Sequence, residues 1–364
     1  MFDCGGGARS ENKLSFSWER GRSWVGVGNC HGINCNHQPS SDSERLTIAS
    51  IRYPTRMFIR IARPMAFLIV ATLLALSSWV VVFAATVRYS PASRQVVEER
   101  LRKYDGDNKQ RETTLKQMFA DVGCNDQHLS EQSVKGSKLP NIVCLLTGTS
   151  DKVIVVGAHY DRVSDGDGVV DNWSGASLLP SIYEAVRGQT REHTYIFVGF
   201  TDEENGMVGS RFYVQQMTGE QVAATEAMVN MDTLGLAPTE VWASHSDKRL
   251  TSALVNIAKG LNLPITGVDV EQVGSTDAEQ FAERKIPRIT IHSLTQENWS
   301  AHILHTSKDK ISAIRLDNYY ETYRLLAAYV AFLDQVLTAN RAAAVNVPLP
   351  LSGSPELASI HPKR

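Results

Sequence analysis

The sequence has few cysteines and almost no net charge, and both shortages exclude classes of protein. Five cysteines in 364 residues are too few for a disulfide-rich scaffold. A formal net charge of −2 and the lack of a long basic run argue against a nucleic-acid-binding protein. There is no internal repeat and no phosphate-binding glycine loop. The remaining composition, 43% hydrophobic and 21% charged, suits one large globular domain with extensions or two modest domains.

Charge is missing altogether from residues 64–87, a segment long enough to span a bilayer as a helix. Four arginines precede it and fewer positive charges follow, so the positive-inside rule predicts that the remainder of the chain is exported. A buried core helix is a weaker interpretation, because such a helix rarely runs this long without a polar face. Small residues at Ala84 and Ala85 favour a cleaved signal peptide, whereas the length of the segment favours a retained anchor.

Residues 1–56 do not resemble a domain, since Gly, Ser and Trp are scattered without sustained periodicity. "MFIRIARPMAFLIV", which begins at Met57, has the basic start and apolar core of an export signal. Translation is therefore expected to start at Met57, with the upstream part poorly ordered or never made. Cys30, His31, Cys35 and His37 have the residue types of a zinc knuckle, but their spacing favours chance. The expected domains are an extension (1–56), a signal peptide or transmembrane anchor (57–88), a folded domain (89–338) and a loose tail (339–364).

Beyond residue 88, apolar runs of strand length alternate with helical patterns. Strands are expected at 139–149, 152–161, 194–200, 227–231, 240–244 and 288–293. Helices are expected twice within 89–121 and at 174–186, 210–217, 248–262 and 315–337. This alternation predicts an α/β fold, a three-layer sandwich with a mainly parallel mixed sheet. Ligands of such sheets bind beyond the carboxyl ends of the strands.

Acidic residues and histidines gather at these strand ends. "FTDEENG" places Glu203 and Glu204 after an apolar strand, where like charges repel unless something lies between them. Other strand ends and helix starts carry His159, Asp161, Asp171, Asn172, Asp232, His305 and Asp309. Each has a structural explanation alone, because an Asp before a helix is usually a cap. Together, two histidines and three carboxylates are the donors that a pair of borderline metal ions requires.

The ordered motifs "HYD", "DNWSGA", "DEENGMVGS", "NMD" and "HTSKD" resemble those of the zinc-dependent aminopeptidase family M28, which includes aminopeptidase Y, glutamate carboxypeptidase II and the glutaminyl cyclases. The resemblance covers roughly residues 110–337. It implies two zinc ions, one held by His159 and Asp232, the other by Glu204 and His305, with Asp171 bridging both. It also implies that Asp161 orients His159, that Glu203 is the general base, and that the Asp171–Asn172 peptide bond is cis.

The same residues predict the chemistry of peptide hydrolysis. Two dications against three carboxylates leave one positive charge, which a metal-bridging hydroxide neutralises, and metal binding lowers the pKa of that water. Glu203 would take the remaining proton as the hydroxide attacks the peptide carbonyl, and would pass it to the leaving amine. We therefore expect an exported or membrane-anchored zinc aminopeptidase. Its partners would be peptides, and the membrane through residues 64–87 if they are not cleaved.

Other functions stay open at this point. A glutaminyl-peptide cyclotransferase shares the fold but differs after the bridging acid, where "DNWSGA" favours a peptidase. A catalytically retired ectodomain that serves as a binding module usually loses ligands, and here all five positions and Glu203 are present. A carboxypeptidase is a further alternative. One departure from the family pattern is Ala278, which stands where a histidine commonly follows the Asp; Asp277 itself is expected to line the pocket.

Two cysteines follow the apolar segment, Cys124 after a predicted helix and Cys144 in a predicted strand. An oxidising compartment permits a disulfide between them, so a short disulfide-closed loop is expected. Two separate thiols are the alternative.

Overall fold

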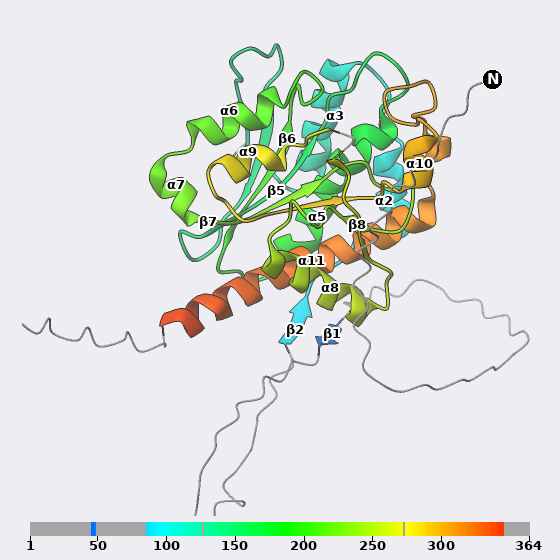
Figure 1. Ribbon diagram of the computed structural model, residues 1–364. Helices are drawn as coiled ribbons and strands as arrows, with labels where there is room; N and C mark the ends of the chain where they lie inside the picture. Colours follow the sequence, from blue (N-terminus) through cyan, green and yellow to red (C-terminus); the bar gives the residue numbers. More distant parts are fainter. Residues whose placement is uncertain (1–44, 49–84, 126, 272–273, 346–364) are drawn as a thin grey trace, which may run out of the picture. The chain divides into compact units, whose positions relative to one another are not determined.

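The computed structural model describes residues 45–48, 85–125, 127–271 and 274–345. Within these ranges, the centre of the fold is an eight-stranded mixed sheet with the order β3-β4-β6-β5-β7-β10-β8-β9 (Figure 1). The strands are β3 (Leu129–Gln132), β4 (Asn141–Leu146), β5 (Val153–His159), β6 (Thr194–Phe200), β7 (Thr225–Met231), β8 (Glu240–Val241), β9 (Thr266–Gly267) and β10 (Arg288–His292). The four central strands, β6, β5, β7 and β10, run parallel, whereas β3, β4 and β8 join through antiparallel pairs. The predicted mainly parallel mixed sheet is confirmed.

Helices cover both faces of the sheet, because successive strand residues point to opposite sides. Ile154 and Val156 of β5 belong to one apolar core with α5, α8 and α11, and Val155 belongs to a second core with α6 and α9. The helices are α2 (Arg94–Leu101), α3 (Asn108–Asp121), α4 (Ser174–Ala176), α5 (Leu178–Arg187), α6 (Val208–Gln216), α7 (Gly219–Ala224), α8 (Lys248–Leu261), α9 (Ala278–Glu283), α10 (Gln296–Ser300) and α11 (Leu316–Val345). The fold is thus the three-layer α/β sandwich that the alternation of elements predicts.

Several element boundaries differ from the sequence-based expectation. The strand expected over 240–244 stops at Val241, because the chain then turns, with His245 N–H donating to Trp242 C=O. The helix expected over 174–186 is divided into α4 and α5. The closing helix α11 continues to Val345, so residues 339–345 of the expected loose tail are helical. Residues 346–364 lie outside the described part of the chain.

The short strands β1 (Arg45–Ile48) and β2 (Ala85–Arg88) pair antiparallel. Residues 85–87, the end of the predicted apolar helix, therefore form a strand, because their backbone groups pair with β1. The rest of the predicted signal or anchor, the start at Met57 and the cluster from Cys30 to His37 lie outside the described residues and stay predictions. None of the helices in the described ranges combines the length and apolarity that crossing a bilayer requires.

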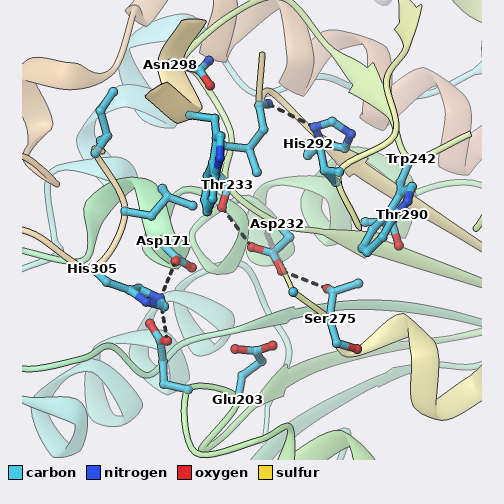
Figure 2. Close-up of a pocket in the computed structure, with 18 of the residues that line it drawn as sticks. Asp171, Glu203, Asp232, Thr233, Trp242, Ser275, Thr290, His292, Asn298 and His305 are labelled. Carbon is cyan, nitrogen blue, oxygen red and sulfur yellow. Dashed lines mark hydrogen bonds and ion pairs between the residues drawn. The ribbon is translucent and has the colours of Figure 1, made fainter. Parts of the chain in front are cut away.

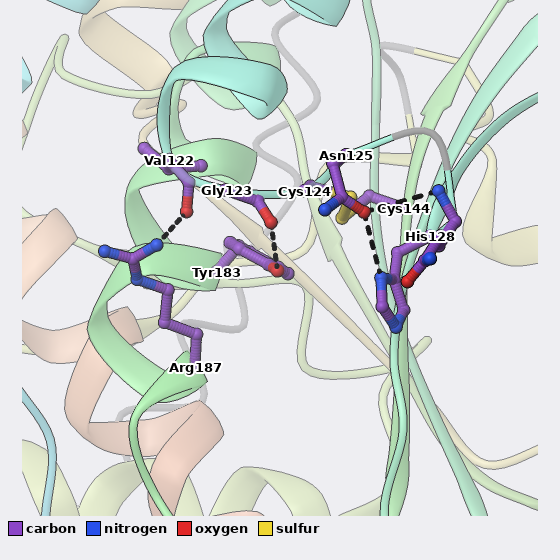
Figure 3. Close-up of a disulfide and its surroundings, with 9 residues drawn as sticks. Val122, Gly123, Cys124, Asn125, His128, Cys144, Tyr183 and Arg187 are labelled. Atoms are coloured by element: carbon purple, nitrogen blue, oxygen red, sulfur yellow. Dashed lines mark hydrogen bonds between the residues drawn. A yellow bond between two sulfur atoms is a disulfide. The ribbon is translucent and has the colours of Figure 1, made fainter.

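A disulfide between Cys124 and Cys144 joins the end of α3 to β4 (Figure 3), as expected. Both cysteines are buried, with 6.3 Å between their Cα atoms. The same junction is held to α5, because Arg187 donates to the carbonyl of Val122 and Tyr183 Oη donates to that of Gly123. Closing a loop of this length stabilises the fold by about 3 kcal/mol in the chain-entropy description.

Candidate active site

Three parallel strands deliver most of the predicted site residues to one edge of the sheet. His159 is the last residue of β5, Glu203 and Glu204 follow the end of β6, and Asp232 follows β7 directly. Because β5 pairs with β6 on one side and β7 on the other, their carboxyl ends meet. The edge therefore collects histidine and carboxylate side chains from three separate stretches of sequence.

Asp171 and His305 reach the same place from loops. Asp171 precedes α4, and its peptide bond to Asn172 is cis, as the resemblance implies. The Asn172 side chain fixes this turn, since its Nδ2 donates to Met231 O (2.9 Å) and its Oδ1 accepts from Gly175 N (2.9 Å). His305 has a left-handed backbone (φ 56°) and an exposed side chain. Figure 2 shows Asp171, Glu203, Asp232 and His305 around one space.

The carboxylate of Asp171 faces both histidines, one with each oxygen. Its Oδ1 lies 3.2 Å from His159 Nε2 and its Oδ2 lies 3.1 Å from His305 Nε2. Asp232 Oδ1 is 3.8 Å from His159 Nε2, and Glu204 Oε2 is 2.9 Å from His305 Nε2. The five residues thus form two groups of three that share Asp171, and the donor atoms within each group lie within 4.8 Å of one another.

The donor set and its electrostatics fit two zinc ions. Imidazole nitrogen and carboxylate oxygen are both zinc ligands, and each group offers one histidine and two carboxylates. The hydrogen bonds that His305 donates to the carboxylates of Asp171 and Glu204 raise the pKa of His305 to about 10. Burial lowers the pKa of His159, yet the surrounding carboxylates raise it well above its usual range. Glu204 Oε1 is buried without a hydrogen-bond partner among the described residues. The site therefore favours positive charge at its centre.

Asp161 and Asp309 hold the ligand-bearing segments in place. Asp161 Oδ1 lies 3.5 Å from His159 Nδ1, and its carboxylate accepts the backbone N–H groups of Glu203 (3.1 Å) and Glu204 (3.3 Å). Asp309 accepts from the backbone N–H groups of Val170 (2.8 Å) and Asp171 (3.1 Å). Such outer partners orient metal ligands.

Glu203 belongs to neither group of three, although it faces the same space. Its Oε2 lies 3.9 Å from His159 Nε2. Burial, reinforced by repulsion from Asp277, Asp232 and Asp171, raises the pKa of Glu203 to about 10. Cations at the two groups of three would stabilise the carboxylate form of Glu203, so its protonation state depends on the charge at the centre.

Two supporting residues are absent from the sequence-based set. Arg111 of α3 is fully buried and donates to the carbonyls of Tyr160 (3.4 Å) and Gly168 (3.0 Å), which belong to the two segments that carry His159 and Asp171. The sequence does contain a sign of its burial, because Arg111 has the helical spacing of the apolar residues Leu115 and Phe119 on α3. Thr276 donates to Asp232 Oδ2 (2.9 Å), a contact between distant segments that gives no local sequence signal.

The expectation that Asp277 lines the pocket is wrong. Asp277 is fully buried at the start of α9, where the turn into the helix carries its side chain into the interior, and burial raises its pKa to about 7. Ser275 and Thr276 line the cavity instead. Ala278, the departure from the family pattern, is fully buried as well.

The fold and this edge define a class of protein, a three-layer α/β sandwich with two groups of candidate metal ligands at the carboxyl ends of parallel strands. The sequence profile of peptidase family M28 matches residues 141–330, and the chain belongs to that family.

Curated relatives match over part of their length. The chain is 28% identical over 142 residues to leupeptin-inactivating enzyme 1 of Streptomyces exfoliatus, covering 38% of this chain and 32% of that protein. It is 28% identical over 242 residues to aminopeptidase YwaD of Bacillus subtilis, covering 63% and 50%. The chain thus spans half or less of the length of these relatives.

Solved structures show the same fold. LapB from Legionella pneumophila superposes with a TM-score of 0.57 at 18% identity, covering 66% of this chain and 71% of that one. An Acidobacteriales bacterium glutaminyl cyclase gives a TM-score of 0.56 at 17% identity, covering 68% and 97%. Because peptidase relatives and a cyclase share this fold, the function has to be argued from the site.

Proposed function

We propose that the chain is an aminopeptidase whose active site holds two zinc ions. The observation that carries the proposal is the position of Asp171, whose two oxygens face one histidine each at 3.2 and 3.1 Å. A carboxylate placed in this way serves two ions at once. The names of the relatives support the substrate class, since YwaD is an aminopeptidase and a Trichophyton rubrum relative, 32% identical over 88 residues, is a leucine aminopeptidase.

The roles of the metal-binding residues follow from the two groups. His159 and Asp232 would hold one ion, Glu204 and His305 the other, and Asp171 both. When bound, such ions polarise a peptide carbonyl and lower the pKa of water. Asp161 would keep the His159 ring in its orientation, and Thr276 would do the same for the Asp232 carboxylate.

Glu203 would transfer the proton. Its carboxylate is close to the centre yet outside both groups of ligands, so it is free to take a proton from the attacking water. Cations at the centre would keep Glu203 ionised before this transfer, and its burial, which raises its pKa, would then help it to hold the proton until the leaving amine accepts it. The adjacent Glu203 and Glu204 thus have different tasks, because the turn after β6 directs one carboxylate to His305 and leaves the other beside His159.

We also propose that the catalytic domain works outside the cytoplasm, either secreted or anchored. The apolar segment 64–87 with arginines before it supports export. The Cys124–Cys144 disulfide is consistent with an oxidising compartment. N-terminal sequencing of the mature protein distinguishes a chain that begins near Thr86 from one that keeps the segment.

Metal analysis combined with a panel of aminoacyl anilides tests the proposed activity. The expected result is zinc-dependent release of aniline from unblocked substrates, with no release from the same substrates carrying an acetylated amino group. Cyclisation of an N-terminal glutaminyl peptide without anilide hydrolysis would instead identify a cyclotransferase. A zinc-loaded protein that does neither would overturn both enzymatic assignments.

A further inference from the structure

A cavity of about 180 Å³ opens beside the metal-binding residues and has walls of two kinds. Asp171, Glu203 and Asp232 form its side toward the centre. Its other walls combine polar side chains with apolar ones, among them Val270, Leu294, Trp299 and Ile303. A peptide whose first carbonyl lies at the centre would place its N-terminal side chain in this cavity. The chemistry of the walls therefore bears on the choice of N-terminal residue.

Two buried polar groups on these walls have no internal partner. Trp242 and Thr290 are 3% and 2% exposed, and Trp242 Nε1 and Thr290 Oγ1 have no hydrogen-bond partner among the described residues. The two residues are cross-strand neighbours, since Trp242 N–H donates to Thr290 C=O (3.1 Å), and Figure 2 shows their side chains next to each other. Leaving buried polar groups without partners is unfavourable, so native structures do so rarely and each such group requires an explanation.

His292, a further polar residue of these walls, already has hydrogen-bond partners. His292 Nε2 donates to Val268 O (3.2 Å), and its Nδ1 accepts from Leu294 N (3.0 Å). Burial lowers the pKa of His292 to about 4, so the ring is neutral. Away from the metal-binding edge, the described lining residues include no Asp, Glu, Lys or Arg. The buried unpaired groups of these walls are thus one indole donor and one hydroxyl, and neither carries a charge.

We propose that this cavity selects N-terminal residues whose uncharged side chain ends in a group that both accepts and donates a hydrogen bond. Tyrosine and glutamine have such tips. The oxygen at the tip would accept a hydrogen bond from Trp242 Nε1–H. The tyrosine O–H, or the amide N–H of glutamine, would donate to Thr290 Oγ1. The apolar wall residues would cover the rest of the side chain. This proposal rests on the aminopeptidase function proposed above.

Matched pairs of anilides test the selectivity, because tyrosine differs from phenylalanine by one hydroxyl, and glutamine and methionine are similar in length. We expect kcat/KM to be about 3- to 10-fold higher for tyrosine than for phenylalanine, the net value of one hydrogen bond. The same direction is expected for glutamine over methionine. Ratios of one or below in both pairs would overturn the proposal.

Two variants locate the selectivity. Thr290→Val removes the hydroxyl at nearly constant volume, and Trp242→Phe removes the indole N–H. Each should lower the tyrosine-to-phenylalanine ratio toward one, with bound zinc measured to show that the centre is intact. Thr322→Val is the matched control, because Thr322 is a buried threonine bonded to Thr239 (2.8 Å) away from the cavity, and its ratio should equal that of the wild type.

Hydrolysis of a leucine anilide separates this inference from the proposed function. If leucine anilide is hydrolysed but Thr290→Val and Trp242→Phe keep the wild-type ratio, the aminopeptidase assignment stands and the polar subsite is wrong. If no anilide is hydrolysed by the zinc-loaded protein, both proposals are wrong.

Discussion

Two buried histidines at opposite ends of neighbouring strands have similar surroundings and different consequences. His193 precedes β6, with its Nδ1 2.9 Å from Asp334 of α11 and its Nε2 3.1 Å from Glu226 of β7. His159 ends β5, with its Nδ1 3.5 Å from Asp161 and its Nε2 3.2 Å from Asp171. Both histidines are at most 1% exposed, and both lie between carboxylates from different elements.

The difference between the two regions is the balance of charge. At His193, one imidazole lies between two carboxylates, and Asp334 also accepts the backbone N–H groups of Glu192 and His193. At the other end, two histidines meet five carboxylates, those of Asp161, Asp171, Glu203, Glu204 and Asp232. The first cluster is satisfied within the protein and links α11 to the sheet, whereas the second calls for added cations. The residue types alone do not separate a structural cluster from a metal centre.

The largest effect is expected from Glu203→Gln, which removes a carboxylate that belongs to neither ligand group. Turnover should fall by about 10²–10⁴-fold, as is typical for loss of a general acid–base group. The zinc content should stay near that of the wild type, because Glu203 is not expected to be a ligand. Steady-state kinetics and metal analysis on the same preparation check both parts. A variant with most of its activity left would show that another group transfers the proton.

His193→Ala tests the other side of the comparison. Removing one partner from a buried charged cluster leaves the Asp334 and Glu226 carboxylates without it and should lower the free energy of unfolding by about 3–5 kcal/mol. Urea denaturation measures this loss. Bound zinc and kcat per folded molecule should not change, since the cluster lies at the far end of the strands. Loss of zinc in this variant would contradict the division of the molecule into two kinds of histidine cluster.

Arg111→Met should weaken zinc binding without removing a ligand. Arg111 fixes the carbonyls of Tyr160 and Gly168, so its loss loosens the segments that carry His159 and Asp171. Loss of a residue that supports metal ligands typically weakens binding by about 10–100-fold, which a competing chelator can measure. Arg100→Met is the control, because Arg100 pairs with Glu184 (2.8 Å) away from the ligands. If the two variants bound zinc with equal affinity, Arg111 would not support the candidate metal ligands and would contribute only to packing.

A smaller effect, on stability, is expected at Glu240. This buried carboxyl group belongs to neither candidate ligand group and has no Lys or Arg partner among the described residues. Burial raises its pKa from 4.5 to about 7, and the nearest histidine, His292, is neutral. A carboxyl with a raised folded-state pKa stabilises the fold below about pH 4.5 and loses that contribution as the pH rises through about 7.

Glu240→Gln removes this titration and keeps the shape of the side chain. The difference in unfolding free energy between variant and wild type should therefore shift in favour of the variant when the pH is raised from 5 to 8.5. The expected shift is about 1–2 kcal/mol. Urea denaturation at the two pH values measures the change. A constant difference between the two proteins would mean that Glu240 does not titrate in this range.

The sequence predicts the sheet edge well because strand ends and motifs coincide there. The apolar runs that become β5, β6 and β7 stop at His159, Phe200 and Met231, so the residues after them share one edge of a parallel sheet. β3 was not predicted, since its sequence, "LSEQ", has no apolar alternation and is held by pairing with β4.

The supporting contacts are beyond sequence reasoning for a different reason. Arg111, Thr276 and the pair Trp242 and Thr290 act through residues far away in the chain. Asp277 was predicted to line the pocket and instead is fully buried. A position in a motif indicates the region in which a residue lies but not the direction of its side chain. Local patterns therefore identify the candidate ligands, and the tertiary structure identifies the residues that hold them in place and those that shape the cavity.

Zinc bound per chain in wild-type protein and in Asp171→Asn, measured after dialysis, tests the central claim most directly. The account predicts two zinc ions in the wild type and the weakening of both together in the variant, because both groups share Asp171. A wild type that binds one ion, or a variant that loses only one of two, would contradict it.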